Sequence, residues 1–93
     1  MLEVLLFGSE NCGSCSLNET RIKDVLREFP EIKFTHYSVD EVGVLVKKFQ
    51  ILTAPTVLIM NNNQEIYRFT GIVERDKFHR EIEYLKYKSE GLI

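Results

Sequence analysis

The chain has 93 residues, of which 44% are hydrophobic and 28% charged, a balance typical of one globular domain spanning residues 1–93. Its formal net charge is −2, with 12 basic residues scattered among 14 acidic ones. Nucleic-acid binding needs a clustered basic face, so we expect no nucleic-acid partner. No apolar run approaches the roughly 20 residues that cross a bilayer, and Met1–Gly8 lacks the basic start of a signal peptide. We therefore expect a cytoplasmic protein with no membrane partner.

The first third of the chain predicts a strand, a helix and a second strand. Leu2–Phe7 is a continuous apolar run, typical of a strand that is buried on both faces. A helix that Pro30 stops follows, with apolar residues recurring at helical spacing: Ile22, Val25, Leu26 and Phe29. Lys33–Val39 is the second predicted strand, because its residues alternate, although imperfectly.

The remainder predicts a helix, a hairpin and a last helix. Asp40 is expected to cap the middle helix, whose apolar positions are Val42, Leu45, Val46 and Phe49. Thr56–Met60 and Glu65–Thr70 flank the turn-forming Asn61–Gln64 and are expected to pair as an antiparallel hairpin. The last helix follows Gly71 and runs to about Tyr87, with its buried positions at Phe78, Ile82 and Leu85.

The element order is strand, helix, strand, helix, strand, strand, helix. The first strand–helix–strand unit should be parallel and right-handed, whereas the closing hairpin must be antiparallel. A mixed four-stranded sheet with helices on both faces accommodates this order. The sequence therefore predicts an α/β protein.

A cysteine pair lies where the first strand hands over to the first helix, in Cys12-Gly13-Ser14-Cys15. We place Cys12 at the first helical position, exposed, where unpaired N–H groups and the helix dipole favour a thiolate. Cys15 lies about one turn further in on the same side, close enough to form a disulfide with Cys12. Gly13 keeps the approach to Cys12 open, so the spacing supplies an attacking and a resolving thiol.

The same pair could instead be inert or form half of a zinc site. Zinc usually takes four protein ligands, and one C-x-x-C motif supplies two. The only histidines, His36 and His79, have no ligand-like spacing, and we expect His36 to be a packed or edge residue. We therefore favour redox chemistry, with no metal and no organic cofactor.

Thr53-Ala54-Pro55-Thr56 opens the third predicted strand. Proline cannot donate a hydrogen bond to a sheet, and the start of a strand is one of its few favourable positions. Alone, this proline would indicate only a turn.

Together, these features resemble the thioredoxin family from about Leu2 to Tyr87, without the extra strand and helix that precede them in full thioredoxins. The resemblance implies a thioredoxin fold, with Cys12 as the attacking thiol and Cys15 as the resolving one. It implies that Pro55 is a cis-proline facing them, and that the Ala54 backbone pairs with an extended substrate. Gly71 matches a glycine that lets a partner approach, and Asp40 also fits the family pattern.

The chain departs from the family at three positions beside the cysteines. Asn11 replaces a tryptophan, Ser14 replaces a proline, and Leu6 replaces a buried aspartate that handles the proton of the second cysteine. With Gly13, Asn11 and Ser14 complete the expected substrate-binding set. Ser14 can donate hydrogen bonds toward a Cys12 thiolate, which favours a more oxidising couple than the roughly −270 mV of thioredoxin. Glu10 or water would have to replace the missing carboxylate.

We therefore expect a thiol–disulfide oxidoreductase, a monomer that reduces protein disulfides. A thioredoxin-reductase-type enzyme or a small thiol would restore its dithiol. Two alternatives remain open: a non-catalytic binding module with the same fold, and a glutathione-dependent, glutaredoxin-like enzyme.

Overall fold

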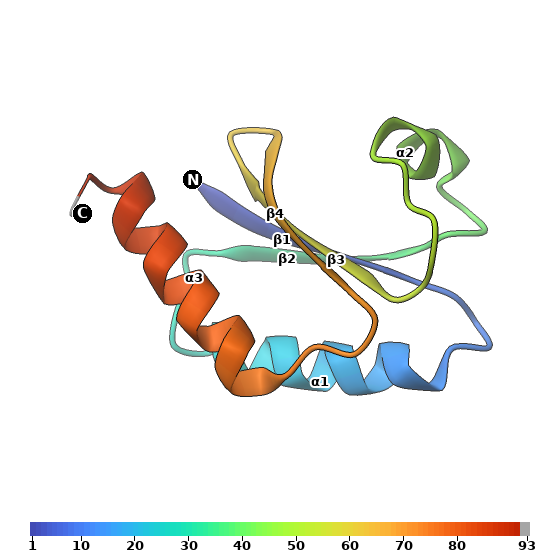
Figure 1. Ribbon diagram of the computed structural model, residues 1–93, viewed down its shortest axis with the longest axis horizontal. Coiled ribbons are helices and arrows are strands. Elements are labelled where there is room, and N and C mark those ends of the chain that lie inside the picture. The colour runs from blue at the N-terminus through green and yellow to red at the C-terminus, as the bar shows by residue number, and fades with distance from the viewer. Residues whose placement is uncertain (92–93) are drawn as a thin grey trace.

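The computed structural model describes residues 1–91, and its elements follow the predicted order (Figure 1). The strands and helices are β1 (Leu2–Gly8), α1 (Gly13–Leu26), β2 (Lys33–Ser38), α2 (Gly43–Lys48), β3 (Thr56–Asn61), β4 (Gln64–Thr70) and α3 (Arg75–Ser89). None of the helices among these described residues is long and apolar enough to span a membrane.

The four strands form one mixed sheet in the order β2-β1-β3-β4. β1 and β2 are parallel, with Leu6 opposite His36 and Gly8 opposite Ser38. β3 is antiparallel to both β1 and β4. The predicted parallel unit and antiparallel hairpin are therefore confirmed, and the first strand lies at the centre of the sheet.

The central position of β1 explains its continuous apolar run, because two hydrophobic clusters lie on opposite faces of the sheet. Val4 and Leu6 belong to the cluster formed with α1 and α3, whereas Leu5 and Phe7 belong to the one that α2 covers. Figure 1 shows α1 and α3 on one side of the strands and α2 on the other. The prediction of helices on both faces is confirmed.

The side chains of β2 also alternate between the two faces of the sheet. Phe34 packs against the cluster on the α1 side, and Tyr37 packs against the cluster on the α2 side. Because side chains alternate along a strand, His36 shares the face of Phe34 and lies beneath α1.

The predicted cap of the middle helix is wrong. α2 begins at Gly43 with Val42 as its N-cap, and no side chain caps it. Asp40 is exposed, and the neighbouring Glu41 N–H donates to Ser38 O at 3.0 Å, which makes a turn there. The chain therefore turns after β2 before the helix can start.

Other predicted boundaries shift by a few residues. α1 ends at Leu26, and Phe29 reaches the core from the following turn. α3 continues to Ser89, past the predicted end at Tyr87. The hairpin turn shrinks to Asn62 and Asn63, with φ of 51° and 69°, since β4 already starts at Gln64.

Candidate active site

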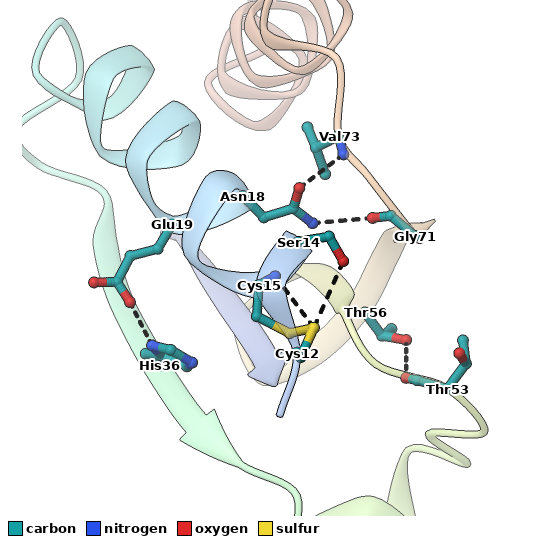
Figure 2. The surroundings of a disulfide bond; sticks show 10 residues. All are labelled: Cys12, Ser14, Cys15, Asn18, Glu19, His36, Thr53, Thr56, Gly71 and Val73. Atoms are coloured by element: carbon teal, nitrogen blue, oxygen red, sulfur yellow. Dashed lines mark hydrogen bonds and ion pairs between the residues drawn. A yellow bond between two sulfur atoms is a disulfide. The ribbon is translucent and has the colours of Figure 1, made fainter. Parts of the chain in front are cut away.

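Cys12 and Cys15 form a disulfide at the junction of β1 and α1, with an S–S distance of 2.08 Å (Figure 2). Cys12 is the N-cap of α1, so its predicted place as the first helical residue is wrong by one position. At an N-cap, a side chain accepts a hydrogen bond from a backbone N–H of the first turn. The Cys12 sulfur takes this role and accepts from the Cys15 N–H at 3.1 Å.

Ser14 adds a second polar group beside the same sulfur. Its Oγ lies 3.6 Å from Cys12 Sγ. When the disulfide is reduced, the Cys15 N–H and the Ser14 hydroxyl can both donate to a Cys12 thiolate, which the positive end of α1 also stabilises.

The two sulfur-bearing residues differ in exposure. Cys12 is half-buried, whereas Cys15 is only 3% exposed. Gly8, at the end of β1, lies against Cys15: a Cβ on this glycine would come within 3.1 Å of Cys15 Sγ. A partner can therefore reach Cys12 but not Cys15.

The Ala54–Pro55 peptide bond is cis, and Pro55 is buried. The Thr56 hydroxyl donates to Thr53 O at 2.7 Å, and the Gly71 N–H donates to Pro55 O at 2.9 Å. Figure 2 shows the first of these hydrogen bonds among the surroundings of the disulfide. These hydrogen bonds tie the loop around the cis bond to the end of β4.

Asn18 is a site residue that the sequence reasoning missed. It is fully buried in α1, where its amide donates to Gly71 O and accepts from the Val73 N–H, both at 2.9 Å (Figure 2). Asn18 thus ties the helix that carries Cys15 to the segment after β4. The sequence did contain an indication of this role, because Asn18 is a polar residue on the same helix face as the apolar Ile22.

The remaining predicted site residues differ in exposure. Asn11 and Gly13 are exposed, whereas Ala54 and Gly71 are half-buried. Gly71 has a φ of 80°, a conformation that favours glycine.

The position that lacks the family's aspartate carries no polar group. Leu6 is fully buried in the cluster beneath α1, and Glu10 is exposed. The Cys15 thiol therefore has no carboxylate from this position of β1.

A histidine and a glutamate lie side by side next to the disulfide. His36 Nδ1 is 2.5 Å from a carboxylate oxygen of Glu19 on α1 (Figure 2). The pKa of Glu19 is lowered, first by the hydrogen bond from Lys23 and, to a smaller degree, by the one from His36. Glu19 is therefore a carboxylate at neutral pH.

Within residues 1–91, no three side chains of the types His, Cys, Asp and Glu are grouped as a metal ion would require.

The comparisons with known proteins agree on one family. The family model described as Thioredoxin matches residues 2–84. The chain is similar to Thioredoxin H2 of Arabidopsis thaliana, with 27% identity over 85 residues, 91% of this chain and 63% of that protein. It is also similar to Thioredoxin-1 of Saccharomyces cerevisiae, with 29% identity over 70 residues, 75% of this chain and 68% of that protein. The chain thus spans only about 63% of the length of the first relative.

A solved structure supports the fold. The chain superposes on thioredoxin 1 of Thermosipho africanus with a TM-score of 0.80 at 24% identity, covering 94% of this chain and 98% of that one. The predicted thioredoxin fold is confirmed by this likeness.

Proposed function

Because the chain belongs to the thioredoxin family, we propose that it is a thiol–disulfide oxidoreductase that reduces protein disulfides. One observation carries the proposal: a half-buried Cys12 sulfur at the N-terminus of α1 is bonded to a buried Cys15. This arrangement provides one thiol that a partner can reach and one that only Cys12 can reach. Such a division is what dithiol exchange requires.

The proposed reaction starts from the reduced pair. The Cys12 thiolate attacks one sulfur of a substrate disulfide, and the other substrate sulfur leaves as a thiolate. The Cys15 thiolate then attacks Cys12 Sγ in the mixed disulfide, which releases the second substrate sulfur and leaves the Cys12–Cys15 disulfide. Two electrons pass from the chain to the substrate, and no metal or organic cofactor takes part.

The residues around the pair are proposed to bind the substrate. Half-buried Ala54, directly before the cis bond, offers its backbone to an extended segment of the substrate. The remaining members of this set are Asn11, Gly13, Ser14, Pro55 and Gly71. The first three lie within two residues of Cys12 along the chain, and the support for the other two is the hydrogen bond from the Gly71 N–H to Pro55 O.

The proposal also covers the domain organisation, the oligomeric state, the compartment and the reductant. We propose that residues 1–93 act as one thioredoxin-like domain and as a monomer in the cytoplasm. A thioredoxin-reductase-type enzyme or a small thiol would return the disulfide to the dithiol. The general support is membership of the family.

Reduction of insulin, with dithiothreitol as the electron donor, tests the activity. The wild-type chain should accelerate the reduction, and Cys12→Ser should abolish the acceleration. Cys15→Ser, reduced and then mixed with insulin after removal of the dithiothreitol, should accumulate a mixed disulfide on Cys12. Alkylation of the reduced chain at pH 7 should modify Cys12 much faster than Cys15. Slow modification of both thiols, with no acceleration, would instead indicate a binding module. Turnover that occurs only with glutathione would indicate a glutaredoxin-like enzyme.

A further inference from the structure

Two side chains, those of His36 and Cys15, lie close against Gly8 at the end of β1. A Cβ on this glycine would lie 3.0 Å from His36 Nε2 and 3.1 Å from Cys15 Sγ. Because both distances start from the same point, the nitrogen and the sulfur are at most about 6 Å apart, a gap that one water can bridge. Figure 2 shows the His36 ring next to the Glu19 carboxylate, to the left of the cysteine pair. These distances are shorter than most real Cβ contacts, so the absence of a side chain at Gly8 is what lets the ring and the sulfur both lie this close to β1.

Cys15 needs a proton acceptor for the resolving step. Its thiol must become a thiolate before it can attack, yet Cys15 is only 3% exposed and Leu6 supplies no carboxylate. The His36 side chain, in contrast, is 39% exposed. The His36 side chain therefore lies near Cys15 and is also in contact with solvent.

We propose that His36, oriented by Glu19, accepts the proton of the Cys15 thiol during the resolving step, directly or through one water. The inference rests on the proposed dithiol exchange and names the residue that activates its second thiol. It assigns to His36 a role beyond the packed or edge position that the sequence indicated.

The orientation of the ring follows from the Glu19 contact. An ionised carboxylate can only accept hydrogen bonds, so Nδ1 of His36 carries a hydrogen and donates it to Glu19. In the neutral ring, Nε2 then holds the free lone pair, and this is the ring atom that lies, like Cys15 Sγ, against Gly8. Glu19 is thus a positioning residue, and its negative charge also stabilises the imidazolium that forms.

The charged groups around His36 are few among the contacts described within residues 1–91. α1 presents Glu19, with Lys23 Nζ 3.1 Å behind it, and the Cys15 thiol. The facing part of β1 presents Leu6 and Gly8, which do not titrate. Glu19 therefore sets the electrostatic environment of the ring.

The step balances in protons and electrons. The Cys15 S–H bond breaks, and its proton moves to Nε2. The sulfur's electron pair forms the bond to Cys12 Sγ, and the bond between Cys12 and the substrate breaks with its pair on the substrate sulfur. The imidazolium then returns its proton to that leaving thiolate or to water.

The test separates the two thiol steps with an aromatic disulfide. The reduced chain is mixed with one equivalent of dithiobis(nitrobenzoate), and the release of thionitrobenzoate is followed by stopped flow from pH 5 to 10. The first release reports attack by Cys12, and the second reports attack by Cys15. In His36→Gln, the second release at pH 7 should be at least about tenfold slower than in the wild type, because a general base has been removed.

The pH profile distinguishes proton transfer from a structural effect. The wild-type second release should already be fast at neutral pH and depend only weakly on pH above it. The His36→Gln rate should keep rising and approach the wild-type rate at high pH, where the thiolate forms without help. Glu19→Gln, which keeps the imidazole, should slow the second release by a smaller factor.

His79→Gln is the matched control. His79 of α3 also faces a glutamate, with Nε2 3.3 Å from Glu28, but Glu28 follows the C-terminal end of α1, whereas Cys15 lies in its first turn. It should leave both releases unchanged. Equal second releases in the wild type and His36→Gln across the pH range would overturn the role of His36 alone. A wild-type chain that gives no second release would instead overturn the dithiol exchange itself.

Discussion

Cys12 occupies the helix position that serine, threonine, aspartate and asparagine usually hold, and its sulfur replaces their oxygen as the acceptor of a backbone N–H. Ser14 adds a hydroxyl 3.6 Å from the same sulfur. A hydrogen-bond donor interacts more strongly with a negatively charged thiolate than with a neutral disulfide sulfur. Both groups therefore stabilise the reduced form more than the oxidised form. The balance between the reduced and oxidised pair therefore depends on two hydrogen-bond donors in one turn.

Removing one of these donors should change the reduction potential. Ser14→Ala loses the hydroxyl and should destabilise the reduced form by about 1 kcal/mol, which lowers the potential by about 20 mV. Equilibration with reduced and oxidised glutathione measures the change. Ser16→Ala, on the exposed side of α1, is the control and should leave the potential unchanged. An equal or higher potential in Ser14→Ala would contradict this role of the hydroxyl.

The position of α1 against the sheet depends on side chains that reach the segment after β4. Asn18 bonds Gly71 O and the Val73 N–H, and Arg21 donates to Val73 O at 2.7 Å. The Gly71 N–H in turn donates to Pro55 O. The helix that carries both cysteines is therefore connected to the cis-proline loop through one short segment.

Asn18→Ala should weaken this connection measurably. It leaves a carbonyl and a buried N–H without partners, so the free energy of unfolding should fall by about 2–4 kcal/mol. Urea unfolding followed by circular dichroism measures the loss. Asn11→Ala, at an exposed asparagine, should change stability by less than about 0.5 kcal/mol. Similar stability of Asn18→Ala and the wild type would show that these hydrogen bonds contribute little.

The turn between β3 and β4 depends on two asparagines in the left-handed conformation. Two-residue hairpins favour this geometry, and residues with a Cβ other than asparagine and aspartate adopt it at a cost. Asn63→Ala should therefore lower the free energy of unfolding by about 1 kcal/mol, whereas Asn63→Gly should not lower it. Thermal unfolding of the two variants provides the comparison. Equal midpoints for Ala and Gly at this position would contradict the argument.

On the scale of the whole molecule, an ion pair links the two helices that cover the same face. Asp24 of α1 contacts Arg75, the first residue of α3, and also Arg27. These contacts lower the pKa of Asp24, with the hydrogen bond from Arg75 the largest cause. The stabilisation is therefore complete above the unfolded-state value of about 3.9 and is lost as the pH falls through the lower folded-state value.

Acid unfolding tests this pair. The free energy of unfolding of the wild type should fall more steeply between pH 5 and 2 than that of Asp24→Asn, because only the wild type must protonate the Asp24 carboxylate. Urea midpoints across this pH range measure both slopes. Parallel slopes would show that the pair does not stabilise the fold.

Much of the architecture could be predicted because hydrophobic periodicity alone indicates it. The unbroken apolar run of β1 requires a central strand, and the short apolar run of β3, followed by asparagines, requires a hairpin. Element ends were less predictable. Asp40 has the chemistry of a cap, but the turn from Ser38 to Glu41 decides where α2 can begin.

The cysteine pair was visible from its spacing, whereas its supporting residues were not. Asn18 acts through partners more than fifty residues away, and a lone polar residue in a helix gives no indication of them. His36 approaches Cys15 only because β2 lies beside β1 and because Gly8 has no side chain. Contacts of this kind depend on tertiary packing rather than on local pattern.

The most direct test of the account is a redox titration of the Cys12–Cys15 pair. The chain is equilibrated in glutathione buffers of graded potential, and its free thiols are trapped with a mass tag. We predict a reversible two-electron couple at a potential above about −270 mV. If the disulfide does not form and break reversibly at any buffer potential, the proposed oxidoreductase activity is contradicted.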